Sequence, residues 1–253
     1  MGVNPGYMRQ VESTEGAEAI RVGNLAAFGD ERVGLCNRRG VRLVPGAEGP
    51  GGDEQIQVVV ACSDEQRMLA WQLVGRRYAW RGYACSQTLA PFPDRERQAF
   101  YTTLLALRGG QPVGTITLGV DSQAGLLVDE VNRREVDLVR GQRRRACELV
   151  RLAIEDGADS RRVWIALLES LNLLCRRIHD ITDMFIEVNP RHAAFYRRVF
   201  GFRVMAPLRS CPRVGAPSVL LRLKREELEA KLAGAGHRQP AAAGVERAEA
   251  LAA

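Results

Sequence analysis

The segment 183–202, DMFIEVNPRHAAFYRRVFGF, constrains the fold more than any other part of the chain. Its residues 184–188 form a short, largely apolar run, which predicts a buried strand. Asn189 and Pro190 end that run and suit the N-cap and the first turn of a helix. Gly201 can adopt the left-handed conformation that ends many helices. The segment therefore predicts a strand, a capped helix and a return toward the sheet.

The rest of the chain predicts further strands and helices on either side of this segment. Apolar runs predict strands at 55–61, 99–108, 112–120, 146–154, 202–205 and 218–223, with a hairpin at Gly109-Gly110. Helical spacing predicts helices that begin near Ser63, Asn132 and Ser160. The first two open with the capping boxes Ser63-x-x-Gln66 and Asn132-x-x-Glu135. A buried stripe is predicted on the first helix, at Met68, Leu69, Leu73 and Trp80.

The order of these elements predicts one α/β (α+β) domain over 55–227, with a mixed sheet and helices on both of its faces. Glycine and proline are frequent in 1–54, so we expect a flexible leader there, with one short helix around 15–28. Alanine and glycine dominate 228–253, which we expect to be a frayed or disordered tail.

The composition narrows the class of protein. No apolar run reaches the roughly 18 residues that a membrane-crossing helix needs, and the N-terminus lacks the pattern of a secretory signal, so we expect a cytoplasmic protein. None of the six cysteines has C-x-x-C spacing and histidine is scarce, so we expect reduced thiols and no metal site. The net charge of +6 comes almost entirely from arginine. Arginine favours an acidic partner, and the absence of a nucleic-acid module favours an acidic protein over nucleic acid.

Glu148 and Arg151 are the first candidates for a functional site. Residues three apart on a strand point to opposite faces of a sheet, so one of these charges faces the packed side unless a bulge shifts the phase. A bulge would also turn backbone N–H groups toward a ligand. The alternative is an edge charge pair that a helix covers.

Asn189 and Tyr196 are the second candidates. A tyrosine hydroxyl near a helix start that faces a sheet crevice can donate a proton to a leaving thiolate. The alternative is an ordinary half-buried tyrosine of the core. A third candidate is a set of arginines that by default form a solvated surface: Arg133, Arg134, Arg140, Arg143, Arg144, Arg145, Arg161, Arg162, Arg176 and Arg177.

The segment 101–202 resembles the acyl-carrier-protein-dependent branch of the GNAT superfamily of acyltransferases. That branch contains the acyl-homoserine-lactone synthases and the long-chain N-acyl amino acid synthases. The likeness is carried by VGTITL (113–118), CELVRLAI (147–154), the helix from Ser160, and IEVNPRHAAFYRRVFGF (186–202). Arg76 and Trp80 resemble the Arg-x-x-x-aromatic element of both groups.

Within this branch, Glu148 and Arg151 match the Glu-x-x-Arg of the homoserine-lactone synthases. The arginine that those synthases carry on the preceding strand is absent, because Thr115 or Thr117 stands in its place. VNPRH before FYRR is more similar to the N-acyl amino acid synthases. The resemblance therefore implies a bacterial N-acyl amino acid synthase with a GNAT-like, mostly antiparallel central sheet.

The implied reaction moves a fatty acyl group from an acyl carrier protein thioester to the amine of an amino acid. Glu148 is the implied general base and Tyr196 the acid for the thiol. The backbone from Leu149 to Ala153 is expected to polarise the thioester carbonyl. The implied substrate-binding residues are Arg76, Trp80, Leu149, Val150, Arg151, Leu152, Ala153 and Asn189. No tightly bound cofactor is expected, since the donor is acyl-phosphopantetheine, with acyl-CoA as a possible substitute.

The turn EDGADSRR (155–162) bears on the choice of donor. Coenzyme A carries a pyrophosphate, which suits a glycine-rich turn of N–H groups, but this turn has one glycine and three carboxylates. Arg161 and Arg162 suit the acidic surface of a carrier protein instead. Two alternatives stay open at this point: a coenzyme-A-dependent N-acetyltransferase, and a non-catalytic module that binds an acyl group or a carrier protein.

Overall fold

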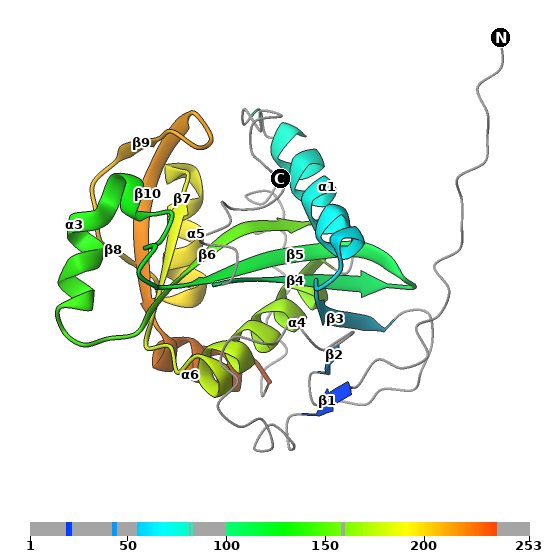
Figure 1. The fold of residues 1–253 in the computed structure, drawn as a ribbon. Helices are drawn as coiled ribbons and strands as arrows, with labels where there is room; N and C mark the ends of the chain where they lie inside the picture. Colours follow the sequence, from blue (N-terminus) through cyan, green and yellow to red (C-terminus); the bar gives the residue numbers. More distant parts are fainter. Residues whose placement is uncertain are drawn as a thin grey trace, which may run out of the picture.

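The computed structural model describes residues 19–21, 42–44, 55–80, 82, 100–157 and 160–236, which form a sheet with helices packed against it (Figure 1). The strands are β1 (Ala19–Arg21), β2 (Arg42–Val44), β3 (Ile56–Val60), β4 (Tyr101–Arg108), β5 (Gln111–Val120), β6 (Ala146–Ile154), β7 (Asp183–Val188), β8 (Arg203–Val204), β9 (Arg209–Cys211) and β10 (Ala216–Lys224). The helices are α1 (Asp64–Trp80), α3 (Asp129–Arg140), α4 (Ser160–Leu173), α5 (Pro190–Phe200) and α6 (Arg225–Gly236), and a π-helical segment, η3 (Leu174–Ile178), continues α4.

The sheet runs in the order β1-β2-β3-β4-β5-β6-β7-β10-β8, and β9 also pairs with β10. The parallel neighbours are β1 with β2 and β6 with β7. All other paired strands are antiparallel. The predicted class is therefore confirmed: a mixed, mostly antiparallel sheet in an α/β (α+β) fold.

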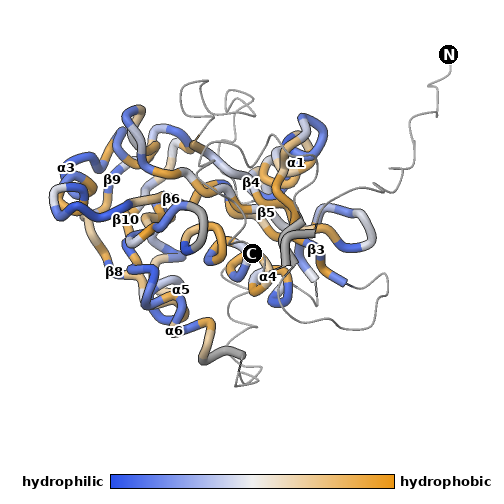
Figure 2. Tube along the Cα trace, turned by 60° about the horizontal axis from the view of Figure 1, so that its bottom comes forward, coloured by the Kyte–Doolittle hydropathy of each residue, from blue (hydrophilic) through white to orange (hydrophobic). Residues whose placement is uncertain are grey.

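Helices cover both faces of this sheet. Ala146 of β6 belongs to a core cluster with Val136 and Val139 of α3. The next residue, Cys147, belongs to a second cluster with Leu167 of α4, because successive residues of a strand point to opposite faces. α1 lies on the face opposite α4 (Figure 1). Hydrophobic residues are concentrated in the central strands β4 and β5, whereas much of α3 and β8 is hydrophilic (Figure 2).

The predicted helix caps are confirmed at α1 and α5. Ser63 Oγ accepts a hydrogen bond from the Gln66 N–H (3.1 Å), and Gln66 Oε1 accepts one from the Ser63 N–H (3.2 Å). At α5, Asn189 Oδ1 accepts from the Arg191 N–H (3.2 Å), and Gly201 ends the helix with φ 84°. These caps satisfy backbone groups that a helix end would otherwise leave without partners.

The buried stripe of α1 differs from the predicted one. Leu73 is buried, but Met68 is 40% exposed and Trp80 is 59% exposed. The buried residues of the helix are Ala70, Leu73, Val74 and Arg77. Their i, i+3, i+4, i+7 spacing defines one helix face, and the arginine belongs to it. Hydrophobicity alone predicted Leu73 correctly, but it included the exposed Met68 and Trp80 and left out Arg77.

The start of α3 also differs from the prediction. The helix begins at Asp129 without a side-chain cap, and Asn132 lies inside it at a kink (φ −124°, ψ 25°). Asn132 Oδ1 accepts a hydrogen bond from Arg209 (2.6 Å). The predicted capping box at Asn132 is therefore wrong, because the side chain is used by a distant hairpin.

The two ends of the chain are described only in part. Within 1–54 the structure describes two short strands, so the helix predicted around 15–28 is wrong at Ala19–Arg21, and the rest of that leader lies outside the described residues. The sequence did not predict β9 or α6. The predicted boundary at 227 falls inside α6, where Leu228 is only 2% exposed and belongs to the core.

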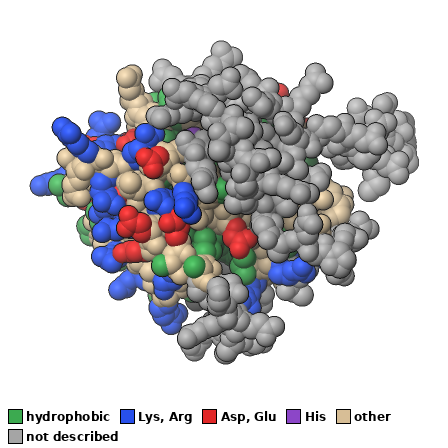
Figure 3. Space-filling view, turned by 90° about the horizontal axis from the view of Figure 1, so that it is seen from below, with side chains coloured by type: hydrophobic (Ala, Val, Ile, Leu, Met, Phe, Trp, Pro, Cys, Tyr) green, Lys and Arg blue, Asp and Glu red, His purple; other side chains and the backbone are tan. Residues whose placement is uncertain are grey.

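Charged side chains cover much of the outside of the described part of the chain. Seen from below, Lys and Arg gather toward the side of α3 and β8, with Asp and Glu among them (Figure 3). Two of the arginines expected at the surface, Arg140 and Arg144, instead form ion pairs with largely buried carboxylates. None of the helices in the described ranges is long and apolar enough to cross a membrane.

Asp183 fixes the end of the sheet at which β6 and β7 meet. Its side chain is fully buried and accepts hydrogen bonds from Thr182 (2.7 Å), Arg222 (2.7 Å) and Arg144. Burial alone would raise the pKa of Asp183, but the bonds from Thr182, Arg144 and Arg222 outweigh it and lower the pKa. The charged form therefore stabilises the fold above the ordinary pKa of 3.8. That contribution is lost as the pH falls through the lowered pKa.

We predict that Asp183→Asn lowers the free energy of unfolding by about 3–5 kcal/mol, because two arginines lose their buried partner. The loss should shrink toward acidic pH, where the wild-type carboxylate is itself protonated. Urea unfolding at several pH values measures both effects.

The control is Glu227→Gln, which breaks the ion pair with Arg203, whose side chain is 71% exposed. It should cost no more than about 1 kcal/mol. Equal losses in the two variants would contradict the anchoring role of Asp183.

Candidate active site

β6 and β7 separate after three paired positions. They pair at Ala146 with Asp183, at Cys147 with Met184 and at Glu148 with Phe185, and then they diverge. A cavity of about 360 Å³ lies at the divergence and is lined by both strands. From Leu149 onward, the edge of β6 that faces β7 has no strand partner among the described residues, so backbone groups along it can pair with a ligand.

A bulge interrupts β6 beside this opening. Thr117 pairs with Val150 and Thr115 pairs with Ala153, so two residues of β6 face one residue of β5. Arg151 adopts φ 55°, which is uncommon for a residue other than glycine. The bulge that would bring Glu148 and Arg151 to one face is therefore present.

The bulge turns Arg151 toward α1. Its guanidinium lies 5.4 Å from the ring centroid of Trp71. Burial lowers the pKa of Arg151, and the charges of Tyr78, Tyr101 and Glu148 act in the opposite direction. Arg151 and Glu148 thus lie close enough to influence each other across the cavity wall.

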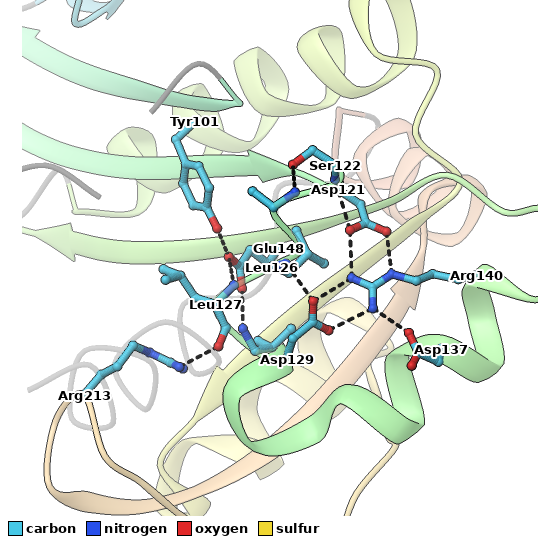
Figure 4. Close-up of polar contacts among 12 residues, drawn as sticks. Tyr101, Asp121, Ser122, Leu126, Leu127, Asp129, Asp137, Arg140, Glu148 and Arg213 are labelled. Carbon is cyan, nitrogen blue, oxygen red and sulfur yellow. Dashed lines mark hydrogen bonds and ion pairs between the residues drawn. The ribbon is translucent and has the colours of Figure 1, made fainter. Parts of the chain in front are cut away.

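Glu148 is fully buried and holds the turn that precedes α3 (Figure 4). Its carboxylate accepts hydrogen bonds from the N–H groups of Leu127 (2.7 Å) and Val128 (3.0 Å) and from the Tyr101 hydroxyl. Burial raises the pKa of Glu148, and these three bonds oppose the rise. Glu148 itself does not line the cavity, but Leu127, which it holds, does.

Arg140 fixes the same turn from the outside (Figure 4). It bonds both carboxylate oxygens of Asp121 (2.7 Å each), both oxygens of Asp129 and one oxygen of Asp137. The hydrogen bond with Asp121 is the main reason that the pKa of Arg140 is raised. Asp129 also accepts from the Leu126 N–H (2.8 Å), so the turn is held on both sides.

A second polar group in the cavity wall was not predicted from the sequence. Arg213, in the β9–β10 hairpin, donates to the Leu127 carbonyl (2.6 Å), to Glu130 (2.8 Å) and to Glu187. Glu187 also accepts from the Ser218 hydroxyl (2.5 Å). Arg213, Glu187 and Ser218 all line the cavity. The sequence signal for this polar group was Glu187, a carboxylate that interrupts the predicted apolar strand 184–188.

The opposite wall of the cavity is apolar. Tyr196 of α5 lies in an aromatic cluster, with its ring centroid 6.4 Å from that of Trp164 and 5.9 Å from that of Phe202. Leu168 and Leu228 extend this wall. The cavity is therefore lined from both faces of the sheet, with charged groups toward one face and apolar groups toward the other.

Most of the predicted substrate-binding residues meet at this cavity. Leu149, Val150, Arg151, Leu152, Asn189 and Tyr196 line it. Ala153 is buried against Leu73 and Val74 of α1 and does not line it.

Arg76 and Trp80 are not among the residues that line the cavity. Arg76 pairs with Glu155 (2.7 Å), and Trp80 lies under the Arg77 guanidinium (5.2 Å) and is largely exposed. α1 contributes Trp71, Val74 and Tyr78 to the cavity instead. Those three residues are spaced by three and four positions, so they share a helix face that excludes residues 76 and 80.

Arginines of α1 pair with the acidic residues of the turn before α4. Arg76 pairs with Glu155, and Arg77 donates to both oxygens of Asp156 (2.5 and 2.6 Å). Arg161 and Arg162 follow in the first turn of α4, where Arg162 is exposed. Within the described ranges, no group of three or more His, Cys, Asp or Glu side chains is arranged to hold a metal ion.

The chemistry that this site can support follows from its parts. An unpaired strand edge with a bulge offers N–H groups to a carbonyl oxygen, as an oxyanion hole does. The apolar wall suits a hydrocarbon chain, and the tyrosine and the carboxylates can move protons.

Comparison with solved structures supports the predicted fold. FeeM, an N-acyl amino acid synthase from uncultured soil microbes, superposes with a TM-score of 0.62 at 24% identity, over 73% of this chain and 99% of that chain. The acyl-homoserine-lactone synthase LasI superposes with a TM-score of 0.50 at 17% identity, over 72% of this chain and 96% of that chain. No curated protein sequence matches the chain.

Comparison with protein families identifies the family to which the chain belongs. The family described as N-acyl amino acid synthase FeeM matches residues 69–224, which is more than half of the chain and contains β6, β7 and all the residues that line the cavity except Leu228. The acyltransferase fold and the N-acyl amino acid synthase family predicted from the sequence are thereby confirmed. The chain belongs to the FeeM family of N-acyl amino acid synthases, and it is an acyltransferase.

Proposed function

We propose that this acyltransferase moves a fatty acyl group from an acyl carrier protein thioester to the amine of an amino acid. The observation that supports this most is the separation of β6 and β7 beside a cavity with one charged and one apolar wall. The activity in the name of the family supports the same reaction. We expect the reaction to take place in the bacterial cytoplasm, without a tightly bound cofactor.

The donor would lie along the open edge of β6. Its phosphopantetheine arm would pair with the backbone beyond Leu149, and the bulge at Arg151 would direct N–H groups to the thioester carbonyl. The apolar wall around Trp164 and Phe202 would take the acyl chain. Asn189 caps α5 and Tyr196 lies further along that helix; both line the cavity, and Tyr196 would protonate the departing thiolate.

Glu148 would act as the general base. Burial raises its pKa, and a raised pKa makes a carboxylate a stronger base near neutral pH. Because Leu127 lies between Glu148 and the cavity, the proton from the amine would reach Glu148 through a water molecule or through the Tyr101 hydroxyl. The amine would then attack the thioester carbonyl, and the C–S bond would break.

We predict that Glu148→Gln lowers the turnover of acyl carrier protein thioester and amino acid by roughly 100- to 10,000-fold. The assay follows free thiol and identifies the N-acyl amino acid by mass spectrometry. The control Glu169→Gln changes an exposed carboxylate of α4 and should leave turnover within about two-fold of wild type. Near-normal turnover by a folded Glu148→Gln variant would remove Glu148 from the mechanism.

Tyr101→Phe should shift the pH dependence of the reaction. The Tyr101 hydrogen bond lowers the pKa of Glu148, so its removal raises that pKa. A base works only when deprotonated, so the acidic limb of the kcat/KM profile should move to higher pH. Thr103→Val, which removes the hydrogen bond to Thr117 (2.9 Å), should leave the limb in place. A shift in both variants, or in neither, would contradict this role of Glu148.

The donor preference can be tested through Arg161 and Arg162. The double reversal Arg161→Glu with Arg162→Glu should lower kcat/KM for acyl carrier protein about ten-fold or more, and change it little for acyl-pantetheine. The control reverses Arg133 and Arg134, an exposed pair on α3.

Two results would redirect the proposal. Faster wild-type turnover with acyl-CoA would favour the coenzyme-A-dependent alternative. Binding of acyl carrier protein without release of thiol would favour a non-catalytic module.

A further inference from the structure

A charged pair stands inside the cavity wall and has no role in the steps above. Glu187 lies near the end of β7, with its side chain 5% exposed, and Arg213 reaches it from the β9–β10 hairpin, with its side chain 19% exposed. Among the described residues that line the cavity, Glu187 is the one carboxylate. Burying two charges is costly, so a pair retained beside a substrate cavity calls for an explanation.

Both members of this pair can accept further hydrogen-bond partners. A guanidinium has five N–H donors, and the Leu127 carbonyl, Glu130 and Glu187 engage three of those of Arg213. A carboxylate offers about four acceptor sites, and Glu187 receives bonds from Ser218 and Arg213. Within the described part of the chain, each group therefore has capacity for a ligand that enters the cavity.

We propose that Arg213 and Glu187 recognise the zwitterionic end of the amino acid acceptor. The Arg213 guanidinium binds the α-carboxylate, and Glu187 binds the α-ammonium group until it is deprotonated for attack. This inference rests on the proposed function. It adds the residues that select the acceptor and the requirement for a free α-carboxylate.

The arrangement explains why both charges are needed. A zwitterion lying antiparallel to the pair places each of its charges against the opposite charge, in a cavity where low dielectric strengthens the attraction. The matching amine without a carboxylate would leave part of Arg213 desolvated and unmatched. Sites built around polar partners discriminate strongly against ligands that lack the matching group.

The pair is also placed correctly for the reaction. Glu187 lies two positions beyond Phe185, the last residue of β7 that pairs with β6, so it stands at the divergence where the thioester is expected. Arg213 bonds the carbonyl of Leu127, whose N–H bonds Glu148. On the α1 side, Trp71 and Tyr78 line the same cavity and suit an apolar or aromatic side chain of the acceptor.

The test compares amino acids with their decarboxylated amines on the full-length chain. The probe pairs are L-phenylalanine with phenethylamine, L-leucine with 3-methylbutylamine, and L-alanine with ethylamine. Affinity is measured by calorimetry without donor, and N-acylation is measured with acyl carrier protein thioester. Wild type should prefer the amino acid in at least one pair by about 100-fold, and Arg213→Gln should reduce that preference to less than about five-fold. Glu187→Gln should weaken the binding of amino acid and amine alike.

The matched control is Arg209→Gln. Arg209 bonds both oxygens of Glu135 and a carbonyl of α3, but it does not line the cavity. The Arg209→Gln variant therefore measures the effect of losing an arginine that holds α3 but does not contact the acceptor. Arg213→Lys keeps the charge and should retain part of the preference.

Each outcome decides the inference. No preference in any wild-type pair, an unchanged preference in folded Arg213→Gln, or an equal loss in Arg209→Gln would overturn it. Preferential binding of amino acids that depends on Arg213, without any N-acyl product, would support this site and contradict the proposed function. Formation of N-acyl product with a preference that substitutions of Arg213 and Glu187 leave unchanged would support the proposed function and contradict this site.

Discussion

Two buried carboxylates, Asp183 and Glu148, hold the closed end of the β6–β7 pair, and the rest of the site depends on that end staying closed. Asp183 binds Arg144 and Arg222 where the two strands meet. Glu148, at the last paired position, binds two backbone N–H groups of the turn before α3. Beyond them the strands separate, and the cavity begins.

The polar wall of the cavity is a continuous series of contacts from distant parts of the chain. Tyr101 of β4 bonds Glu148 of β6, which bonds the turn at Leu127, which in turn bonds Arg213 of the β9–β10 hairpin. Arg213 closes the series at Glu187 of β7. Each member fixes the next, so side chains on three strands (β4, β6 and β7) and one hairpin, together with the turn at Leu127, hold one geometry around the cavity.

Sequence patterns predicted the parts of the fold that depend on contacts between residues close together in the chain. The capping box at Ser63 and the caps of α5 at Asn189 and Gly201 involve residues within a few positions of each other, so their patterns were sufficient. The bulge between Glu148 and Arg151 could also be predicted from the sequence. Residues three apart on a regular strand point to opposite faces, so one of these two charges would face the packed side without a bulge. Family resemblance then predicted a mixed, mostly antiparallel sheet around them.

Contacts between distant segments were beyond the reach of these patterns. The sequence pattern predicted Asn132 as a helix cap, but its side chain accepts a hydrogen bond from Arg209, which is distant in the sequence. Trp80 looked like part of a buried face, but the helix turns Arg77 inward to meet Asp156. Glu187 and Arg213 are separated along the chain by α5, β8 and β9, and no pattern local to either residue predicts their pairing. The catalytic and binding roles given to Glu148, Tyr196 and their neighbours remain predictions.

The cavity is lined from both faces of the sheet, and this has a kinetic consequence. In the reaction proposed above, a thioester along the open edge of β6 and an amine at the charged wall would occupy different walls of the cavity. Both substrates could then be bound together, and the acyl group would pass directly from sulfur to nitrogen without resting on the protein. Steady-state rates for such an enzyme follow a ternary-complex pattern, with intersecting rather than parallel double-reciprocal lines.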